Sequence, residues 1–132
     1  MKILIAEDDY ASRKFLSKFL SGYGECDMVV DGLETIDAYM LAMKEKTPYE
    51  LICLDIMMPK IDGVRVLKAI RDLETQNGIL PAKRSKIIMV TALGKTDMVN
   101  DAFEYGCDAY IPKPVDTNEL LGTIKKLGLI TN

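Results

Sequence analysis

The sequence predicts an α/β fold: a doubly wound, five-stranded parallel sheet with five helices on its two faces. Short apolar runs with the length of buried strands alternate along the chain with longer stretches whose apolar residues recur at helical spacing. Gly or Pro follows several of these runs, as expected for turns. Because crossovers between parallel strands are right-handed, this alternation favours a sheet covered by helices on both sides.

The predicted strands are short and rich in Ile, Leu and Val. They comprise residues 2–6, 27–30, 51–55, 87–90 and 109–111. The third run, LICLD, leads straight into Asp55. Aspartate is disfavoured in strands and is seldom buried without a partner, so a carboxylate at this position points to a function.

The predicted helices separate these strands. They comprise residues 10–21, 31–46, 63–75, 96–105 and a last helix that starts at Asp116 and Glu119. The second helix has a possible capping pair, Asp31 with Glu34. Its expected apolar stripe consists of Leu33, Ile36, Tyr39, Met40 and Met43. Residues 75–86 contain Gly, Pro and basic residues, which predicts a rather long loop before the fourth strand.

Five strands in this pattern most often take the order 2-1-3-4-5 of flavodoxin-like folds, which bind their ligand in the crevice between strands 1 and 3. Half of a Rossmann fold is the alternative. That alternative needs a glycine-rich turn after the first strand, where this chain reads AEDDYAS.

Length and net charge limit the number of domains and the classes of binding partner. The 132 residues suit one domain, and a net charge of −3 gives no electrostatic case for binding nucleic acid or an anionic membrane. The small basic group Lys83, Arg84 and Lys86 is expected in a solvated loop with modest room for a partner contact. The N-terminal MKILIA is too short for a signal peptide and no apolar run could span a membrane, so we expect a cytoplasmic protein.

Histidine is absent, which excludes Ser-His-Asp and Cys-His catalysis. The three cysteines, Cys26, Cys53 and Cys107, are isolated and have apolar neighbours, as is typical of reduced core thiols. A zinc site is a weak alternative without histidine or a Cys-x-x-Cys pair.

The residues at the carboxyl ends of the strands suggest a chemistry. Glu7 and Asp8 follow the first strand, Asp55 ends the third, Thr91 ends the fourth, and Lys113 lies between two prolines after the fifth. Three converging carboxylates repel one another, and Mg²⁺, which prefers oxygen ligands, resolves the repulsion. A cation, an ammonium and a hydroxyl around one aspartate suit a phosphoryl group, and that aspartate can itself be the nucleophile.

These motifs together resemble the response-regulator receiver domains of bacterial two-component signalling, and among them a stand-alone, chemotaxis-regulator-like receiver. AEDD, LDIMMPKIDG, VTA and YIPKP occur in the family's order, and the resemblance covers about residues 2–128. It implies one receiver domain over residues 1–132. The chain stops soon after the last predicted helix, so we expect no output domain in it.

The resemblance also implies a role for each acid. Asp55 matches the phosphoacceptor, which takes its phosphoryl group from a phosphohistidine of a histidine kinase or phosphotransfer protein. Glu7, Asp8 and Asp55 match the acids that hold Mg²⁺, or Mn²⁺ as a substitute, with Asp8 a direct ligand and Glu7 acting through water. Met57 would offer its backbone carbonyl to the metal.

The remaining matches concern switching and output. Thr91 and Lys113 match the residues that contact the phosphoryl group, Thr91 and Tyr110 match the switch pair, and the peptide bond before Pro114 is often cis in this family. The surface of the fourth helix, fifth strand and fifth helix would report the change to a downstream protein. A phosphorylation-dependent dimer is a further outcome that the resemblance allows.

Some residues depart from the family's usual pattern or fit other readings. Met57 and Leu93 flank the place where an attacking water must be oriented, and neither side chain can hydrogen-bond that water, so we predict slow self-dephosphorylation. Asp9, Asp62 and Gly63 are expected to have structural roles at helix starts.

Three other functions require sequence features that differ from those of this chain. An Asp-nucleophile phosphatase of the haloacid-dehalogenase type needs a second aspartate at position 57. A flavin carrier needs a hydroxyl- and glycine-rich loop after the first strand. A degenerate receiver that binds partners without phosphorylation conflicts with the intact set of Glu7, Asp8, Asp55, Thr91 and Lys113.

Overall fold

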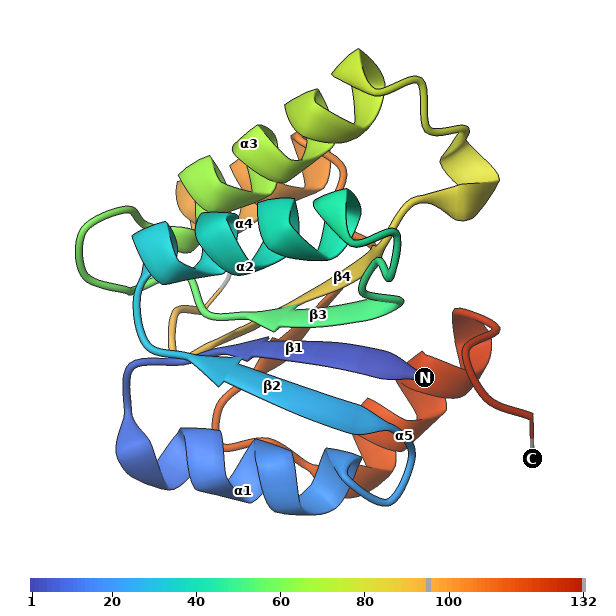
Figure 1. Ribbon diagram of the computed structural model, residues 1–132. Helices are drawn as coiled ribbons and strands as arrows, with labels where there is room; N and C mark the ends of the chain where they lie inside the picture. Colours follow the sequence, from blue (N-terminus) through green and yellow to red (C-terminus); the bar gives the residue numbers. More distant parts are fainter. Residues whose placement is uncertain (95, 132) are drawn as a thin grey trace.

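A computed structural model describes residues 1–94 and 96–131. Its five parallel strands form one sheet in the order β2-β1-β3-β4-β5, which confirms the predicted topology (Figure 1). The strands are β1 (Lys2–Ala6), β2 (Glu25–Val29), β3 (Leu51–Leu54), β4 (Lys86–Thr91) and β5 (Ala109–Pro112). The helices are α1 (Tyr10–Leu20), α2 (Gly32–Lys44), α3 (Gly63–Gln76), α4 (Asp97–Glu104) and α5 (Thr117–Lys126), with a short 3₁₀ turn, η1 (Pro81–Lys83).

The sheet is the middle layer of three. α1 and α5 cover one face, and α2, α3 and α4 cover the other (Figure 1). Successive residues of a strand point to opposite faces, so Ile3 and Ile5 pack in one core cluster while Leu4 and Ala6 pack in the other. Burial on both faces explains why the central strands are continuous apolar runs.

Most helices begin where the sequence indicates. Asp9, Asp31, Asp62 and Asp116 each accept a backbone N–H of the helix that follows, so the structural roles predicted for Asp9 and Asp62 are confirmed. The Asp31–Glu34 pair is also confirmed. Asp31 accepts the N–H of Glu34 at 2.8 Å, and the Glu34 carboxylate accepts the N–H of Val30 at 3.1 Å.

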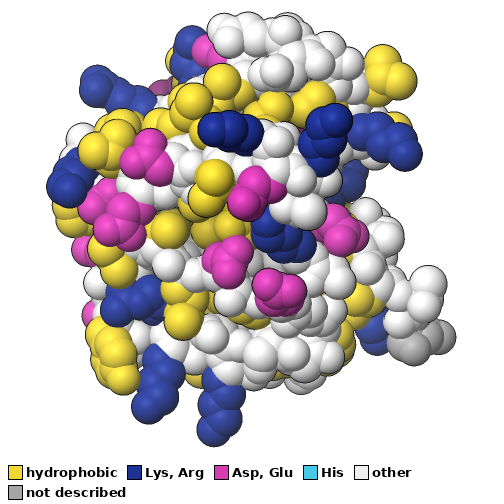
Figure 2. All heavy atoms as spheres, viewed as in Figure 1, with side chains coloured by type: hydrophobic (Ala, Val, Ile, Leu, Met, Phe, Trp, Pro, Cys, Tyr) yellow, Lys and Arg dark blue, Asp and Glu magenta, His cyan; other side chains and the backbone are white. Residues whose placement is uncertain are grey.

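The expected apolar stripe of α2 is partly wrong. Leu33 and Met40 are 47% and 50% exposed, whereas Thr35, Tyr39 and Ala42 are buried. The Thr35 hydroxyl donates to the carbonyl of Asp31 at 2.7 Å, which satisfies its polar group inside the core. Leu33 and Met40 instead add to the exposed apolar surface. On the face shown in Figure 2, apolar side chains lie among charged ones.

The basic group is only partly solvated, and Lys86 is the first residue of β4 rather than part of the predicted loop. Arg84 is half-buried, and its guanidinium donates to the carbonyl of Ile79 at 3.1 Å and to the Thr75 hydroxyl at 3.2 Å. Arg84 therefore fastens the predicted loop, part of which forms η1, to the end of α3. Lys83 remains exposed, as expected.

The cysteine prediction is confirmed for two of the three thiols. Cys53 and Cys107 are buried, and burial raises the pKa of Cys53 to about 12 and that of Cys107 to about 11. Cys26, on the edge strand β2, is only half-buried.

Candidate functional site

The three predicted acids meet at the carboxyl end of the sheet, the left edge in Figure 1. β1 and β3 are neighbours, with Ala6 paired to Leu54, so the residues that follow these strands lie side by side. One carboxylate oxygen from each of Glu7, Asp8 and Asp55 lies within 4.8 Å of the others. The convergence inferred from the strand order is thereby confirmed.

The acids differ in their access to water. Glu7 and Asp55 are 1% and 5% exposed, whereas Asp8 is exposed. The Lys113 ammonium donates to Asp55 Oδ2 at 2.9 Å and forms an ion pair with Glu7 Oε1. One cation thus faces three carboxylates, and the cluster keeps an excess of negative charge.

The electrostatics follow from this burial. Burial, assisted by the charge of Asp55, raises the pKa of Glu7 from 4.5 to about 7, although hydrogen bonds from Lys113 and the Asp9 N–H oppose the shift. Burial by itself lowers the pKa of Lys113, but its contacts with Glu7 and Asp55 outweigh that effect and raise it. Lys113 therefore stays charged at neutral pH, whereas Glu7 changes charge near neutrality.

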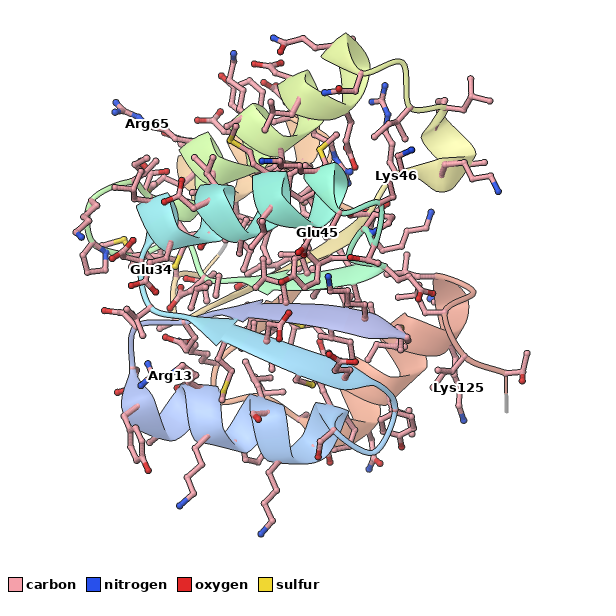
Figure 3. All side chains as sticks on the ribbon, in the orientation of Figure 1. Arg13, Glu34, Glu45, Lys46, Arg65 and Lys125 are labelled. Atoms are coloured by element: carbon pink, nitrogen blue, oxygen red, sulfur yellow. The ribbon has the colours of Figure 1, made fainter. Side chains whose placement is uncertain are left out.

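Arg13 is a residue of the site that sequence reasoning missed. From α1, its guanidinium donates to the backbone carbonyls of Glu7 at 2.9 Å and Asp8 at 3.2 Å (Figure 3). Arg13 therefore holds the acidic loop by its main chain and leaves the carboxylates free. A basic residue one turn into a helix is too common a pattern to have indicated this role.

The donor set suits a hard divalent cation. All the available atoms are carboxylate oxygens, two of the acids are buried, and the third faces the solvent that Mg²⁺ retains in its coordination shell. Burial, with the Asp55 charge beside it, raises the pKa of Glu7, and a dication bound between the acids would offset the cost of ionising it. These residues therefore fit the predicted Mg²⁺.

The loop after β3 completes this side of the site. The Met57 N–H donates to Asp55 Oδ1 at 3.2 Å, so the loop folds back over the carboxylate. Gly63 is required where the loop enters α3, because a Cβ there would lie 2.1 Å from the Asp55 carbonyl oxygen. The Met57 side chain is 58% exposed, and the role of its carbonyl toward a metal stays a prediction.

Thr91 and Tyr110 meet at the backbone of Leu93. Thr91 is fully buried, and its hydroxyl oxygen accepts the Leu93 N–H at 3.3 Å. Tyr110 is half-buried, and its hydroxyl donates to the Leu93 carbonyl at 2.6 Å. The two predicted switch residues are thus linked through one short segment, and their movement stays a prediction.

An apolar groove of about 260 Å³ adjoins the site. Its lining comprises Ala11, Ser12, Phe15 and Leu16 of α1 and Lys113, Pro114 and Val115 after β5. Phe15, which fits the apolar spacing of α1, is 45% exposed because it faces this groove rather than the core. The Lys113–Pro114 peptide bond is cis, as the resemblance implied.

Comparison with known proteins identifies the class. The response regulator receiver domain family matches residues 3–125, so the chain belongs to this family. It is 31% identical over 126 residues to the chemotaxis protein CheY of Treponema pallidum, covering 93% of this chain and 79% of that protein. It is also 31% identical to CheY of Bacillus subtilis, covering 95% of each chain.

Solved structures agree. The CheX–CheY–BeF₃–Mg²⁺ complex from Borrelia burgdorferi contains a chain with 27% identity and a TM-score of 0.82, covering 97% of this chain and 89% of that one. A co-crystal of the Saccharomyces cerevisiae histidine phosphotransfer protein Ypd1 with the receiver domain of Ssk1 gives 28% identity and a TM-score of 0.81, covering 97% and 88%. Within residues 1–94 and 96–131, every helix is too short or too polar to cross a bilayer.

Proposed function

We propose that this chain is a phosphorylation-controlled signalling module whose phosphoacceptor is Asp55. The observation that carries the proposal is the placement of Asp55: its carboxylate lies in the acidic cluster with Glu7 and Asp8 and 2.9 Å from the Lys113 ammonium. A carboxylate held between a cation site and an ammonium is arranged for phosphoryl transfer, which depends mainly on positioning and charge stabilisation.

The phosphoryl donor is a phosphohistidine of a histidine kinase or phosphotransfer protein, since this chain has no histidine of its own. An Asp55 oxygen forms the new O–P bond as the donor's P–N bond breaks, and the imidazole nitrogen keeps the electron pair. Bound Mg²⁺ supplies positive charge for the phosphoryl oxygens. Lys113 remains beside the acceptor, and Glu7, Asp8 and Asp55, with the Met57 carbonyl, would hold the metal.

Docking of the donor fits the groove beside the site. Phe15 and its neighbours on α1 offer an apolar surface that ends at Lys113, next to Asp55. The yeast phosphotransfer protein named above was crystallised with a receiver domain similar to this chain. A partner that covered the groove would bring its phosphohistidine to the open side of the acidic cluster, where Asp8 is exposed.

The output follows from the Leu93 segment. A phosphoryl group adds charge and strong acceptor oxygens, which can draw the Thr91 hydroxyl toward Asp55. Because Thr91 and Tyr110 both bind the Leu93 backbone, that movement would release Tyr110 and alter the surface of α4, β5 and α5 for a downstream protein. Phosphorylation-dependent dimerisation through this surface is part of the same proposal.

The protein is a regulatory phosphoacceptor rather than an enzyme with a separate substrate. Its two covering layers share one sheet, so we treat residues 1–132 as one receiver domain. Self-dephosphorylation should be slow, because the side chains of Met57 and Leu93, beside the acceptor, cannot orient a water.

The test uses beryllofluoride with Mg²⁺, which mimics an aspartyl phosphate. We expect NMR shifts around Asp55, Thr91 and Tyr110 in the wild type and none in Asp55→Asn. A small acyl phosphate should add one phosphoryl group by mass to the wild type alone. If beryllofluoride and Mg²⁺ cause no NMR shifts in the wild type, the proposal is wrong and the chain is instead a phosphorylation-independent binding module.

A further inference from the structure

We propose that Asp31 and Gly32, at the start of α2, are positioning residues that hold the loop between β3 and α3 in its metal-binding shape. The inference rests on the proposed function, because that loop, residues 55–62, carries the acceptor Asp55 and the Met57 carbonyl. Neither Asp31 nor Gly32 belongs to the acidic cluster, and both lie far from the loop in the sequence.

The first observation is a close backbone contact. The Gly32 N–H donates to the carbonyl of Pro59 at 3.2 Å. A Cβ at position 32 would lie 2.0 Å from the carbonyl oxygen of Ile61 and 2.7 Å from its Cβ. Any residue other than glycine would therefore push the second half of the loop away from α2.

The second observation is a charged contact at the same place. The Asp31 carboxylate is 7% exposed and serves two partners: it caps α2 through the Glu34 N–H at 2.8 Å, and it pairs with the Lys60 ammonium at 3.4 Å. Lys60 has a φ of 71°, a left-handed conformation that is uncommon for a residue with a side chain. The contact with Asp31 thus helps to hold Lys60 in a backbone shape that it would otherwise avoid.

The two halves of the loop depend on different anchors. In the first half, Ile56 and Met58 are buried in the core, so their side chains fix the chain there. In the second half, Pro59 and Lys60 are exposed, and Ile61 and Asp62 are partly buried, so the contacts with Asp31 and Gly32 add to a weaker core packing. Met57 lies between the two buried residues of the first half, and the segment held by Asp31 and Gly32 begins two residues after it, so a displacement of that segment reaches the Met57 carbonyl through Met58.

The same segment also contacts the other side of the metal site. The carbonyl of Val29, three residues before Gly32, accepts the N–H of Glu7 at 3.1 Å. Residues 29–32 therefore touch the backbone of both acid-bearing loops, the one after β1 and the one after β3. A small displacement of this segment would change the distance between the acids that must share one cation, whose preferred geometry is nearly octahedral.

The principal test is Gly32→Ala, with Mg²⁺ affinity measured by calorimetric titration. The matched control is Gly24→Ala, since a Cβ at Gly24 would lie 2.3 Å from the Met1 carbonyl oxygen, at the opposite end of the sheet. Both variants carry a comparable clash and should lose stability. We expect Mg²⁺ affinity to fall by about tenfold to hundredfold in Gly32→Ala alone, as for other residues that orient metal ligands.

A readout without metal separates positioning from simple destabilisation. In EDTA, amide hydrogen exchange of residues 57–61 should accelerate in Gly32→Ala and stay at the wild-type rate in Gly24→Ala. Equal loss of Mg²⁺ affinity in both variants, or no loss in Gly32→Ala, would overturn the inference. Failure of the wild type itself to bind Mg²⁺ would instead overturn the proposed function.

Lys60→Met provides a second test should Gly32→Ala fail to fold. The substitution removes a positive charge from the loop that carries Asp55, so electrostatics alone predicts tighter Mg²⁺ binding. If Asp31 positions the loop through Lys60, Mg²⁺ affinity should instead fall in Lys60→Met. The expected loss is about twofold, because the Asp31–Lys60 pair is partly exposed and individually weak. Tighter or unchanged Mg²⁺ binding in Lys60→Met would contradict the proposed role of Asp31.

Discussion

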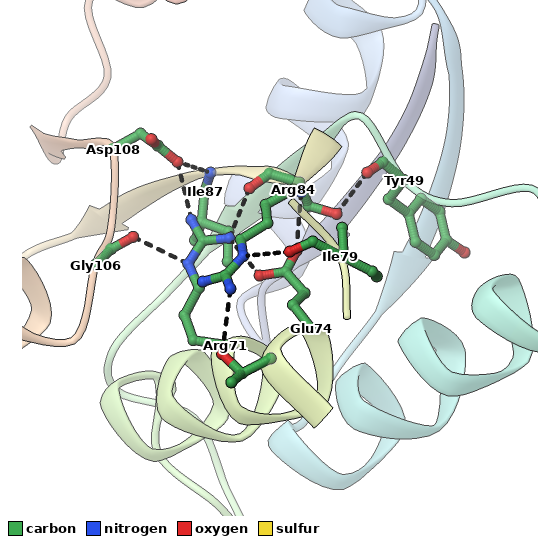
Figure 4. Close-up of polar contacts among 10 residues, drawn as sticks. Tyr49, Arg71, Glu74, Ile79, Arg84, Ile87, Gly106 and Asp108 are labelled. Carbon is green, nitrogen blue, oxygen red and sulfur yellow. Dashed lines mark hydrogen bonds and ion pairs between the residues drawn. The ribbon is translucent and has the colours of Figure 1, made fainter. Parts of the chain in front are cut away.

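Both ends of the sheet bury carboxylates, but the two ends differ in the charge and hydrogen-bond partners that these carboxylates have. At the amino end, the Arg71 guanidinium lies between Glu74, at 2.7 Å, and Asp108, at 3.0 Å (Figure 4). The Ser85 N–H donates to Glu74 at 2.9 Å, and the Ile87 N–H donates to Asp108 at 2.8 Å. At the carboxyl end, Glu7 and Asp55 share one ammonium, with Asp8 close by.

The difference separates structural charge from functional charge. Arg71 also donates to the carbonyls of Ser85 and Gly106, so it ties α3 to the residue before β4 and to the turn before β5, with four of its five N–H groups in use. Such a network is closed and gains nothing from a ligand. The acidic cluster is open, because its excess negative charge is relieved either by protonation of Glu7 or by a cation from outside. Stability should therefore come from one end and regulation from the other.

The largest effect is expected at the closed end. Arg71→Met would leave Glu74, which is fully buried, without its counter-charge, and should lower the free energy of unfolding by about 3–5 kcal/mol. Urea unfolding measures it. The control is Lys68→Met on the same helix, whose pair with Asp72 is exposed and should cost well under about 1 kcal/mol. Similar losses in both variants would show that the Arg71 network is not a structural centre.

At the carboxyl end of the sheet, the second prediction is a gain in the free energy of unfolding rather than a loss. Since the pKa of Glu7 is about 7 in the folded protein against 4.5 when unfolded, the folded state binds the extra proton between these values. Its ionisation therefore costs stability as pH rises through that window. Without metal, Glu7→Gln should be more stable than the wild type by up to roughly 3 kcal/mol at about pH 8, with the gain vanishing near pH 4.5.

Thermal unfolding in EDTA across this pH range measures the gain, and Mg²⁺ provides the control. Added Mg²⁺ should stabilise the wild type by mass action and leave Glu7→Gln less affected. If Glu7→Gln is less stable than the wild type above neutral pH, ionised Glu7 does not destabilise the metal-free protein and the prediction is wrong.

The third effect is kinetic and concerns the phosphorylated form. Met57→Asn would place an amide beside the acceptor, where it can orient an attacking water, and the aspartyl phosphate should decay roughly tenfold faster. Loss of the phosphorylated species with time, followed by mass spectrometry, measures the rate. Met57→Leu is the matched control and should decay like the wild type. A wild type that already decays as fast as Met57→Asn would refute slow self-dephosphorylation.

The smallest effect is expected at the link between the site and the output face. Tyr110→Phe removes the hydroxyl that donates to the Leu93 carbonyl at 2.6 Å, and should cost about 1 kcal/mol of stability. Faster amide exchange around Leu93, with Mg²⁺ affinity unchanged, would locate the loss in this link. Weaker Mg²⁺ binding in Tyr110→Phe would instead mean that the link and the cluster are one unit.

The sequence was sufficient for the site's acids because of a general property of parallel sheets. The carboxyl ends of all strands lie at one edge, so once the order 2-1-3-4-5 was inferred, Glu7 and Asp55 had to approach each other although they are 48 positions apart in the chain. Helix starts were equally readable, since an aspartate before a helix caps it through local bonds.

The sequence patterns did not predict the contacts between elements. α2 has apolar residues on two sides, and only its packing on the sheet decided that Tyr39 is buried while Leu33 and Met40 are exposed. Likewise, spacing says nothing about Arg71 meeting Asp108 or Gly32 meeting Ile61, because each contact depends on how whole helices and loops are placed. Local patterns determined the elements, their order and the chemistry at the strand ends. The tertiary structure alone decided which charges are satisfied, because satisfaction depends on partners distant in the chain.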